Sequence, residues 1–434
     1  MKTAQTDVAV IGGGLGGLAT AAYVARGGRS VVLYEKAAAV GGRAATTAAG
    51  EFFFNLGPHA LYAAGHGIAV LRELGVEFHG GKPSPSGGFA VDRGAKHALP
   101  GGFLSLVTTG LFGLPAKLET ARLLAGFARI DAAPLARTPI REWLETNVRH
   151  ADVRRLIAAL IRLATYSDDP DRLSAGAAIA QLQSALRSNV LYLDRGWQTL
   201  IDGLCATAVA AGARIVTSTR AAGIERAGAT WRVRSADGAA LDAAAVVIAG
   251  GPDAAADLLR DAVPAARRWM DGSIPVKAAC LDLALSRLPQ PRATFSLGID
   301  RPLYLSVHSA VASLGPAGHA VIHVAKYLGR NASDPKADER ELEGLMDLVQ
   351  PGWRELVLQR RFLPDMLVAH ALPTAATGGL AGRPAPAVPH TDGLYVVGDW
   401  VGPHGMLADA SLASAKQAAN AILQRATRPA RAAA

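Results

Sequence analysis

The clearest pattern of hydrophobic and polar positions lies in the first 35 residues. Asp7–Ile11 is a run of mostly β-branched apolar residues, typical of a strand buried in a parallel sheet. Apolar residues then recur at helical spacing up to Gly27, a residue type that commonly ends helices, and Ser30–Tyr34 is a second apolar run. The order predicts a β-strand, an α-helix and a second parallel β-strand.

The rest of the chain alternates between segments of this kind and segments of another kind. Residues 104–190 have a mostly helical pattern. Further apolar runs predict strands over 213–217, 229–234, 244–249, 276–284, 303–311, 320–327 and 393–398, and helices over 336–350 and 406–424.

This arrangement predicts an α/β protein with a discontinuous Rossmann-like domain. We expect that domain to consist of residues 1–75, 190–255 and 385–434. Residues 76–189 and 256–384 are expected to form a second, inserted α+β domain.

Composition narrows the classes of partner. The formal net charge is +9, but the arginines are scattered, so we expect no nucleic-acid partner. The two cysteines, Cys205 and Cys280, lie far apart, which suits a reducing cytoplasm, and no Cys/His spacing typical of zinc is present, so no metal is expected. Nothing in the composition predicts an oligomeric state.

Membrane contact is a minor expectation. The sequence has no uninterrupted apolar run of about 20 residues, the length that a spanning helix needs. Residues 98–127 come closest, but glycine, proline and Lys117 interrupt them. We therefore expect a cytoplasmic protein, with peripheral contact of this segment with a membrane as an alternative.

The turn after the first strand carries a dinucleotide-binding pattern. Gly12, Gly14 and Gly17 match G-x-G-x-x-G, in which the glycines allow a tight turn, close approach of a pyrophosphate and close packing of helix on strand. Glu35 follows the second strand, where a carboxylate accepts hydrogen bonds from ribose hydroxyls. An acid here disfavours a ribose that carries a 2′-phosphate.

Further motifs resemble one enzyme superfamily. They are Gly41-Gly42-Arg43, Gly57-Pro58-His59, Arg195-Gly196 and Gly398-Asp399-Trp400. With the fingerprint, they resemble the flavin amine oxidases, protoporphyrinogen oxidases and phytoene-desaturase-type enzymes. The resemblance implies FAD and a glutathione-reductase-type FAD-binding domain, with the inserted segments as the substrate domain.

The resemblance also implies positions for the cofactor. Gly42 and Arg43 would lie along the pyrophosphate and flavin, Asp399 at the ribityl chain and Ala221 at the adenine, and the helix after Gly405 would point its N-terminus at the flavin. Independently, Asp399 follows a buried strand, at the edge of an open sheet where ligands bind. The predicted cofactor-binding residues are Gly12, Gly14, Leu15, Gly17, Glu35, Lys36, Gly42, Arg43, Gly57, Pro58, His59, Ala221, Gly398, Asp399, Gly405, Met406 and Leu407.

The predicted chemistry is oxidation of an organic substrate. No second fingerprint for a pyridine nucleotide is present, so electrons are expected to enter FAD from a substrate C–H bond and to leave to oxygen or another carrier. Three residues are candidates for catalysis. Lys277 resembles the lysine that holds a water at the flavin in amine oxidases, or is a solvated lysine at a strand start. His59 and His404 would move a proton, or bond to the flavin or backbone.

One departure from the amine oxidases guides the choice of substrate. They usually have a tyrosine where this chain has Met406. An aromatic residue stacks around an amine, whereas methionine packs against apolar groups. We therefore favour a desaturase or dehydrogenase acting on a mostly apolar small molecule, and Trp400 is expected in the cavity wall. The alternatives are an amine oxidase and, from another class, a non-catalytic lipid-binding protein of the prenylated-GTPase chaperone type.

Overall fold

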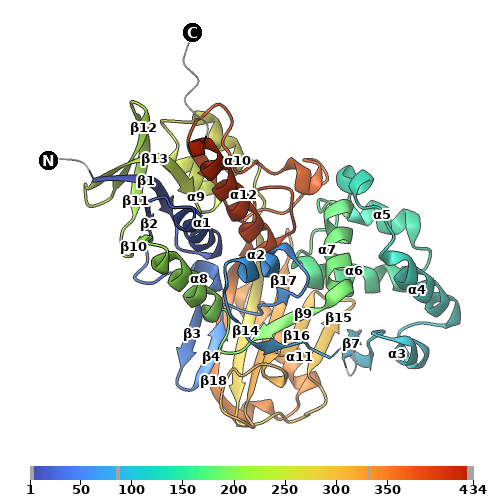
Figure 1. Cartoon of the computed structure of the whole chain (residues 1–434). Helices are drawn as coiled ribbons and strands as arrows, with labels where there is room; N and C mark the ends of the chain where they lie inside the picture. The colour runs from blue at the N-terminus through green and yellow to red at the C-terminus, as the bar shows by residue number, and fades with distance from the viewer. Residues whose placement is uncertain (1–3, 85–87, 331–332, 428–434) are drawn as a thin grey trace.

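The computed structural model describes residues 4–84, 88–330 and 333–427. Two large sheets dominate it (Figure 1), each with seven strands in the described part. The first sheet has the order β10-β2-β1-β13-β12-β11, and β19 also pairs with β13. Its strands are β1 (Ala4–Ile11), β2 (Val31–Tyr34), β10 (Arg214–Val216), β11 (Ala221–Ala227), β12 (Thr230–Ser235), β13 (Ala240–Ile248) and β19 (Leu394–Val396).

The parallel half of this sheet brings distant parts of the chain together. Val10 is paired with Leu33 of β2 on one side and with Val247 of β13 on the other. Val247 is in turn in register with Tyr395 of β19. The carboxyl ends of β1, β2, β13 and β19 therefore lie at one edge, where open α/β sheets bind ligands.

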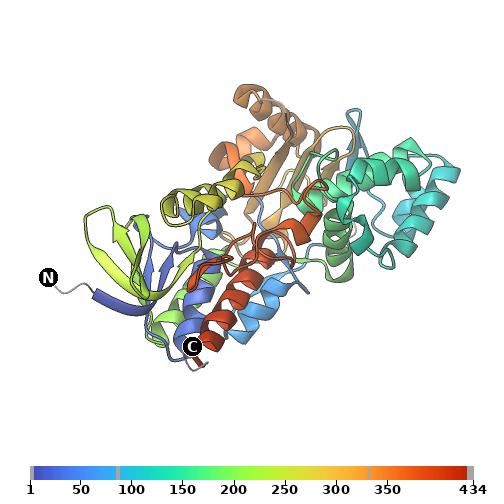
Figure 2. The same ribbon diagram turned by 90° about the horizontal axis from the view of Figure 1, so that it is seen from above.

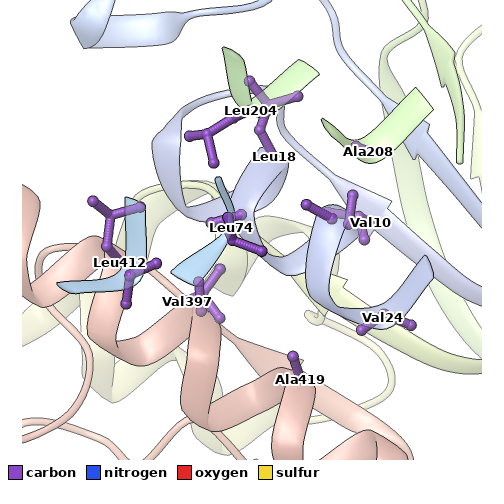
Figure 3. Packing of buried hydrophobic residues seen from close by; sticks show 14 of the residues in the cluster. Val10, Leu18, Val24, Leu74, Leu204, Ala208, Val397, Leu412 and Ala419 are labelled. Atoms are coloured by element: carbon purple, nitrogen blue, oxygen red, sulfur yellow. The ribbon is translucent and has the colours of Figure 1, made fainter. Parts of the chain in front are cut away.

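Four helices cover one face of the first sheet: α1 (Leu15–Arg26), α2 (His66–Glu73), α8 (Gln198–Ala210) and α12 (Leu407–Thr427). Their apolar side chains form one core, in which Leu18, Leu204 and Leu412 are fully buried (Figure 3). A second apolar cluster lies on the other face of this sheet. It contains Trp400 and Leu259, the residue that follows α9 (Pro252–Leu258).

The second sheet has the order β18-β14-β17-β16-β15-β7-β8 and is mostly antiparallel. Its strands are β7 (Phe89–Asp92), β8 (Ala95–Ala98), β14 (Val276–Leu285), β15 (Phe295–Gly298), β16 (Leu303–Val307), β17 (Ala320–Leu328) and β18 (Val357–Ala369). α11 (Pro335–Val349) packs its apolar side chains on one face. Shorter strands occur elsewhere: β3 (Thr46–Ala49), β4 (Phe52–Asn55), β5 (Leu61–Tyr62), β6 (Gly80–Gly81) and β9 (Val190–Leu193).

A group of helices projects beside the second sheet: α3 (Phe103–Thr108), α4 (Leu114–Phe127), α5 (Ile140–Asn147), α6 (Ala151–Thr165) and α7 (Ala175–Ser188). Seen from above, these helices lie at the end of the molecule opposite the first sheet (Figure 2). α10 (Arg267–Asp271) is a short helix after α9. In the described residues, no helix combines the length and apolar character needed to cross a bilayer.

The expected α/β fold class with a Rossmann-like sheet is confirmed. All strands of the first sheet fall within residues 1–75, 190–255 and 385–434, although residues 428–434 lie outside the described part. The domain boundaries themselves stay a prediction. The sequence pattern missed β3 to β9, β11, β15 and β18, and the run expected over 303–311 ends at Val307 and continues as a 3-10 turn.

Candidate functional site

A cavity of about 960 Å³ lies at the carboxyl edge of the first sheet. Its lining includes the turns after β1, β2, β13 and β19. It also includes Met366–Val368 of β18, and residues of the segment 56–62 that leads from β4 into β5. The volume is at the upper end of the range of small-molecule sites, roughly 300–1,000 Å³.

The fingerprint turn leaves bare backbone at this cavity. Gly12 has φ +109°, a conformation that favours glycine, and a Cβ at Gly17 would lie 1.9 Å from the Gly12 carbonyl oxygen. Gly17 therefore allows α1 to pack on β1 and does not itself line the cavity. A Cβ at Gly14 would meet only the Gly41 carbonyl oxygen, at 3.9 Å, so this position is open. α1 begins at Leu15 without a side-chain cap, which leaves its first N–H groups free for an anion.

A second glycine turn faces the first. The Gly41 N–H donates to the Gly13 carbonyl at 2.8 Å, and a Cβ at Gly42 would lie 3.6 Å from the Gly14 Cα. Gly42 has φ +55° and also lines the cavity. The two turns thus form a continuous stretch without side chains, which suits close approach of a phosphate group.

Glu35 closes one end of the cavity. It follows β2, is buried, and accepts hydrogen bonds from the Gly13 N–H at 2.6 Å and the Ala37 N–H at 2.8 Å. Lys36 and Ala221 line the same end. The bonds fix the carboxylate against the fingerprint turn, so the acid and the glycines form one unit.

Arg43, Asp399 and His370 form an ion cluster in the cavity wall. Two nitrogens of Arg43 donate to the two oxygens of Asp399, each at 2.9 Å. The backbone N–H of His370 and its Nδ1 also contact these oxygens, at 2.9 and 2.8 Å. Burial alone would raise the pKa of Asp399, but Arg43 and His370 outweigh it and hold the pKa far below its usual value.

His59 is held between two backbone carbonyls. Its Nδ1 lies 3.1 Å from the Gly57 oxygen and its Nε2 lies 3.0 Å from the Arg43 oxygen. Burial lowers the pKa of His59 to about 4, so the ring is neutral at neutral pH and donates to only one of these carbonyls. The ring also packs edge-on against Trp197. These contacts fit the structural reading of His59 better than proton transfer.

The remaining wall is apolar and aromatic. Tyr62 donates to the Ala164 carbonyl at 2.8 Å, and Tyr166 donates to the Pro58 carbonyl at 3.0 Å. Burial raises the pKa of both phenols, so they stay neutral. Other residues of this wall are Leu56, Ala60, Leu61, Trp197, Met366, Leu367 and Val368.

One carboxylate of α12 also lines the cavity. Asp409 lies in the first turn of the helix, is 5% exposed, and accepts a hydrogen bond from the Gly67 N–H at 2.7 Å. Burial raises its pKa to about 6, partly opposed by the bond from Gly67.

A second polar cluster lies on the inner face of the second sheet. Asp282 contacts His323 Nδ1 at 2.6 Å and accepts from Arg361, and both Asp282 and His323 are fully buried. Arg361 also donates to the Asn55 carbonyl, at the start of the segment that lines the cavity. His323 and His308 are both buried, and neither lines the cavity.

The structure brings most predicted cofactor residues to the cavity: Gly12, Gly14, Leu15, Glu35, Lys36, Gly42, Arg43, Pro58, His59, Ala221, Gly398, Asp399 and Leu407 all line it. Gly57, Gly405 and Met406 lie behind the lining. A Cβ at Gly57 would lie 2.9 Å from the Cys280 Sγ, so this glycine lets the chain cross the second sheet. Met406 is buried at the start of α12. Trp400 is buried in the core and donates to the Gly250 carbonyl.

Two predicted catalytic residues do not reach the cavity. Lys277 shares the face of β14 that packs toward α11, whereas Cys280 and Ala278 share the opposite face with Met366. Its ammonium pairs with Asp365 at 2.8 Å, and the side chains are 39% and 60% exposed, respectively. His404 is exposed and packs against the ring of His66. The solvated reading therefore fits Lys277, and neither residue is placed to act on a ligand in this cavity.

Sequence reasoning missed several residues of the site, including four polar ones whose hydrogen bonds are described above. Tyr62, Tyr166, His370 and Asp409 belong to no motif, and they reach the cavity only through the fold. Asp409 had one available signal, because it follows the Gly405 turn at the N-terminus of the last helix.

Comparisons with known proteins agree with this geometry. The family model for flavin containing amine oxidoreductases matches residues 15–423. An oxidoreductase from Methanosarcina mazei has TM-score 0.74 and 20% identity and covers 95% of this chain and 99% of its own. Cyclohexylamine oxidase from Brevibacterium oxydans has TM-score 0.75 and 17% identity, over 98% of this chain and 100% of its own. At these identities the likeness concerns the fold.

A carotenoid 3,4-desaturase from Haloarcula japonica is 48% identical over 52 residues, which cover 12% of this chain and 10% of that enzyme. The chain therefore matches only a small part of this curated relative. The family match, in contrast, spans nearly the whole chain and includes α1 and most of α12, two helices whose first residues line the cavity. This chain belongs to the family of flavin-containing amine oxidoreductases and is an FAD-dependent oxidoreductase.

Proposed function

We propose that FAD lies in the cavity with its pyrophosphate on the two glycine turns. The fit rests on bare backbone, because side chains are absent where Gly14 and Gly42 face each other. Glu35, Lys36 and Ala221 would hold the adenosine end. The flavin end would lie toward Arg43, Asp399, Pro58, His59 and Leu407, which line the rest of the cavity.

In this arrangement the protein would supply binding, orientation and exclusion of water. FAD, when bound, accepts two electrons as a hydride. Arg43 and Asp399 would fix polar groups of the cofactor, and the N-terminus of α12 would place its positive dipole end near them. Lys277 and His404 have no part in this proposal.

We infer that the enzyme removes a hydride from a C–H bond of a mostly apolar organic molecule. The observation that carries this inference is the aromatic and apolar wall beyond the glycine turns, whose two tyrosine hydroxyls are already bonded to backbone carbonyls. Such a wall offers shape and apolar contact rather than hydrogen bonds.

Amine oxidation is the second candidate. The cyclohexylamine oxidase with a similar fold and the family description favour it. Asp409 is a carboxylate in the cavity that could attract an ammonium group. Met406, just before α12, stands where the amine oxidases usually have a tyrosine, and it is buried behind the lining. This position therefore offers no aromatic ring to an amine, which favours the first candidate.

The test adds candidate substrates to the enzyme without oxygen and measures reduction of the bound flavin by its absorbance. The panel contains polyenes and cyclic hydrocarbons on one side and alkyl and cyclic amines on the other, each matched in carbon number. We expect bleaching of the flavin by apolar members alone. Bleaching by the amines alone would overturn this assignment and would show that the enzyme is an amine oxidase.

We also propose that the helix pair α3–α4 contacts an anionic lipid surface, which would give an apolar substrate a route to the enzyme. Five exposed large apolar side chains lie on this pair: Phe103, Leu104, Val107, Leu114 and Leu118. Lys117 and Arg122 lie on α4 and Arg129 follows it in the sequence, while Glu119 is occupied by the backbone N–H groups of Arg149 and His150. Apolar side chains with neighbouring cations suit a membrane interface.

A further inference from the structure

Desaturation removes a hydride from one carbon and a proton from its neighbour, so a group must take up that proton. Among the described residues, four carboxylates line the cavity: Glu35, Asp257, Asp399 and Asp409. Glu35 is bound by two backbone N–H groups at the adenosine end. Asp257 is exposed and paired with Arg260. Asp399 receives two bonds on each oxygen. Three of the four are therefore already engaged.

The other titratable groups on the flavin side are engaged as well. Both nitrogens of His59 face carbonyls, and His370 Nδ1 contacts Asp399. The hydroxyls of Tyr62 and Tyr166 donate to carbonyl oxygens. None of these groups presents a free lone pair of suitable basicity to the cavity.

Asp409 differs from all of them in its surroundings. A Cβ at Gly65 would lie 2.0 Å from its Oδ2, and a Cβ at Gly67 would lie 2.7 Å from its Oδ1. The carboxylate thus fits a notch formed by two glycines at the start of α2. Among the residues that the structure describes, it has one hydrogen bond, which the Gly67 N–H donates to Oδ1. The notch holds the carboxylate in one orientation at the cavity.

We propose that Asp409 is the general base that accepts the substrate proton. The proposal rests on the desaturation proposed above. One substrate carbon loses a hydride, which carries the electron pair of its C–H bond to FAD, the two-electron oxidant. The adjacent carbon loses a proton to the Asp409 carboxylate, and the electron pair of that C–H bond becomes the new π bond.

The surroundings of Asp409 suit a base of moderate strength. Burial raises its pKa, and no cation is paired with it in the described residues. The titratable groups around it come from four parts of the chain. They are Tyr62 of β5, His66 of α2, His404 and Arg383. Arg383 donates to the Gly405 carbonyl, and the rings of His66 and His404 pack together. Burial and then the charge of Asp409 raise the pKa of Tyr62, which places the two groups close together. A carboxylate that titrates near neutral pH suits general base catalysis.

The variant Asp409→Asn separates this role from a purely structural one. The asparagine side-chain oxygen can still accept the Gly67 N–H, so the start of α2 keeps its partner. Glu73→Gln is the matched control, because Glu73 joins the same two helices through Lys416 at the surface. We expect Asp409→Asn to bind FAD normally and to slow flavin reduction by an apolar substrate by at least about 100-fold, the lower range for a lost general base.

The pH profile gives a second readout. Wild-type flavin reduction should fall as the pH drops through about 6, the pKa of Asp409, and Asp409→Asn should lose this dependence. A third readout needs no activity. Because the folded pKa of Asp409 is raised, its neutral form stabilises the fold at low pH, and this stability is lost as the pH rises through about 6. Asp409→Asn should therefore be more stable than wild type above pH 6, with the difference vanishing toward pH 4.

The outcomes are distinguishable. A variant that is reduced at the wild-type rate with the wild-type pH profile would return Asp409 to the role of a helix cap. Reduction of the wild-type flavin by amines alone would contradict both proposals, the desaturation and the role of Asp409 as general base. A neutral amine has its own lone pair and needs no such base. If the stability of both proteins depended on pH in the same way, burial would not raise the pKa of Asp409.

Discussion

At the scale of single residues, the Arg43–Asp399 pair joins the two ends of the chain. The residues are 356 positions apart, and Asp399 is almost completely buried. The carboxylate depends on Arg43 and His370, because an isolated buried charge is costly. The pair therefore stabilises the fold and shapes the cavity wall at the same time.

Replacing Arg43 by methionine should show this dependence. We expect Arg43→Met to lower the free energy of unfolding at neutral pH by about 2 kcal/mol, less than for a fully enclosed pair because Arg43 is 35% exposed. The depressed pKa of Asp399 means that the pair stabilises the fold above the usual carboxyl pKa, and that the loss should fade only in strong acid. Urea unfolding at several pH values measures it.

A suitable control is Arg234→Met, since Arg234 pairs with Glu225 at the exposed edge of the first sheet. Its effect should be small. If both variants lost the same free energy of unfolding, the burial of Asp399 would add nothing to the contribution of its ion pair.

Lys277 shows how residue-level resemblance can mislead. Side chains alternate between the faces of a strand, so a match of segments does not fix which face a residue joins. The pairing of β14 with β18 contains bulges, and Lys277 lies on the same face of β14 as the residues that pack against α11. Its sequence neighbours Val276 and Ala278 belong to the opposite clusters.

At the scale of elements, long apolar runs were predictable and mixed edge strands were not. β13, β14 and the second half of β1 are largely buried and mostly apolar. β18 has thirteen residues but is half exposed, and it contains Pro364 and several charged residues. In the described part of the chain β18 pairs with β14 alone, at the edge of the sheet, so its sequence pattern resembles that of a loop.

The α3–α4 pair gives a prediction at this scale. Phe103 is 85% exposed and Leu104 is 74% exposed, although both are apolar. We expect the wild type to float with vesicles that contain anionic phospholipid and to bind neutral vesicles weakly. Phe103→Glu with Leu104→Glu should abolish flotation, because it removes apolar contact and adds negative charge.

Leu358→Glu is the control, since Leu358 is exposed on β18, far from this pair in the sequence. Vesicle binding that survives the double substitution would refute a lipid contact here. A concentration-dependent change in mass that the double variant removes would instead assign the surface to a second copy of the chain.

At the scale of the whole molecule, the site is assembled from parts that no local pattern connects. The fingerprint and Glu35 were predictable because strand, helix and acid follow in one short segment. The other wall of the cavity comes from β18, the segment 56–62 and Tyr166 at the end of α6. Its residues could not be predicted, because they meet only when both sheets have formed.

The central claim is that FAD occupies the cavity between the glycine turns and the start of α12. The most direct measurement is the amount of FAD per chain in the purified protein, released by denaturation and quantified by its absorbance. We compare the wild type with Gly14→Val, whose side chain would enter the open space at the fingerprint, and with Gly344→Val, on the exposed face of α11. We expect about one FAD per chain in the wild type and in Gly344→Val, and folded but largely flavin-free Gly14→Val. Full occupancy in folded Gly14→Val, or a colourless wild type that does not take up added FAD, would contradict it.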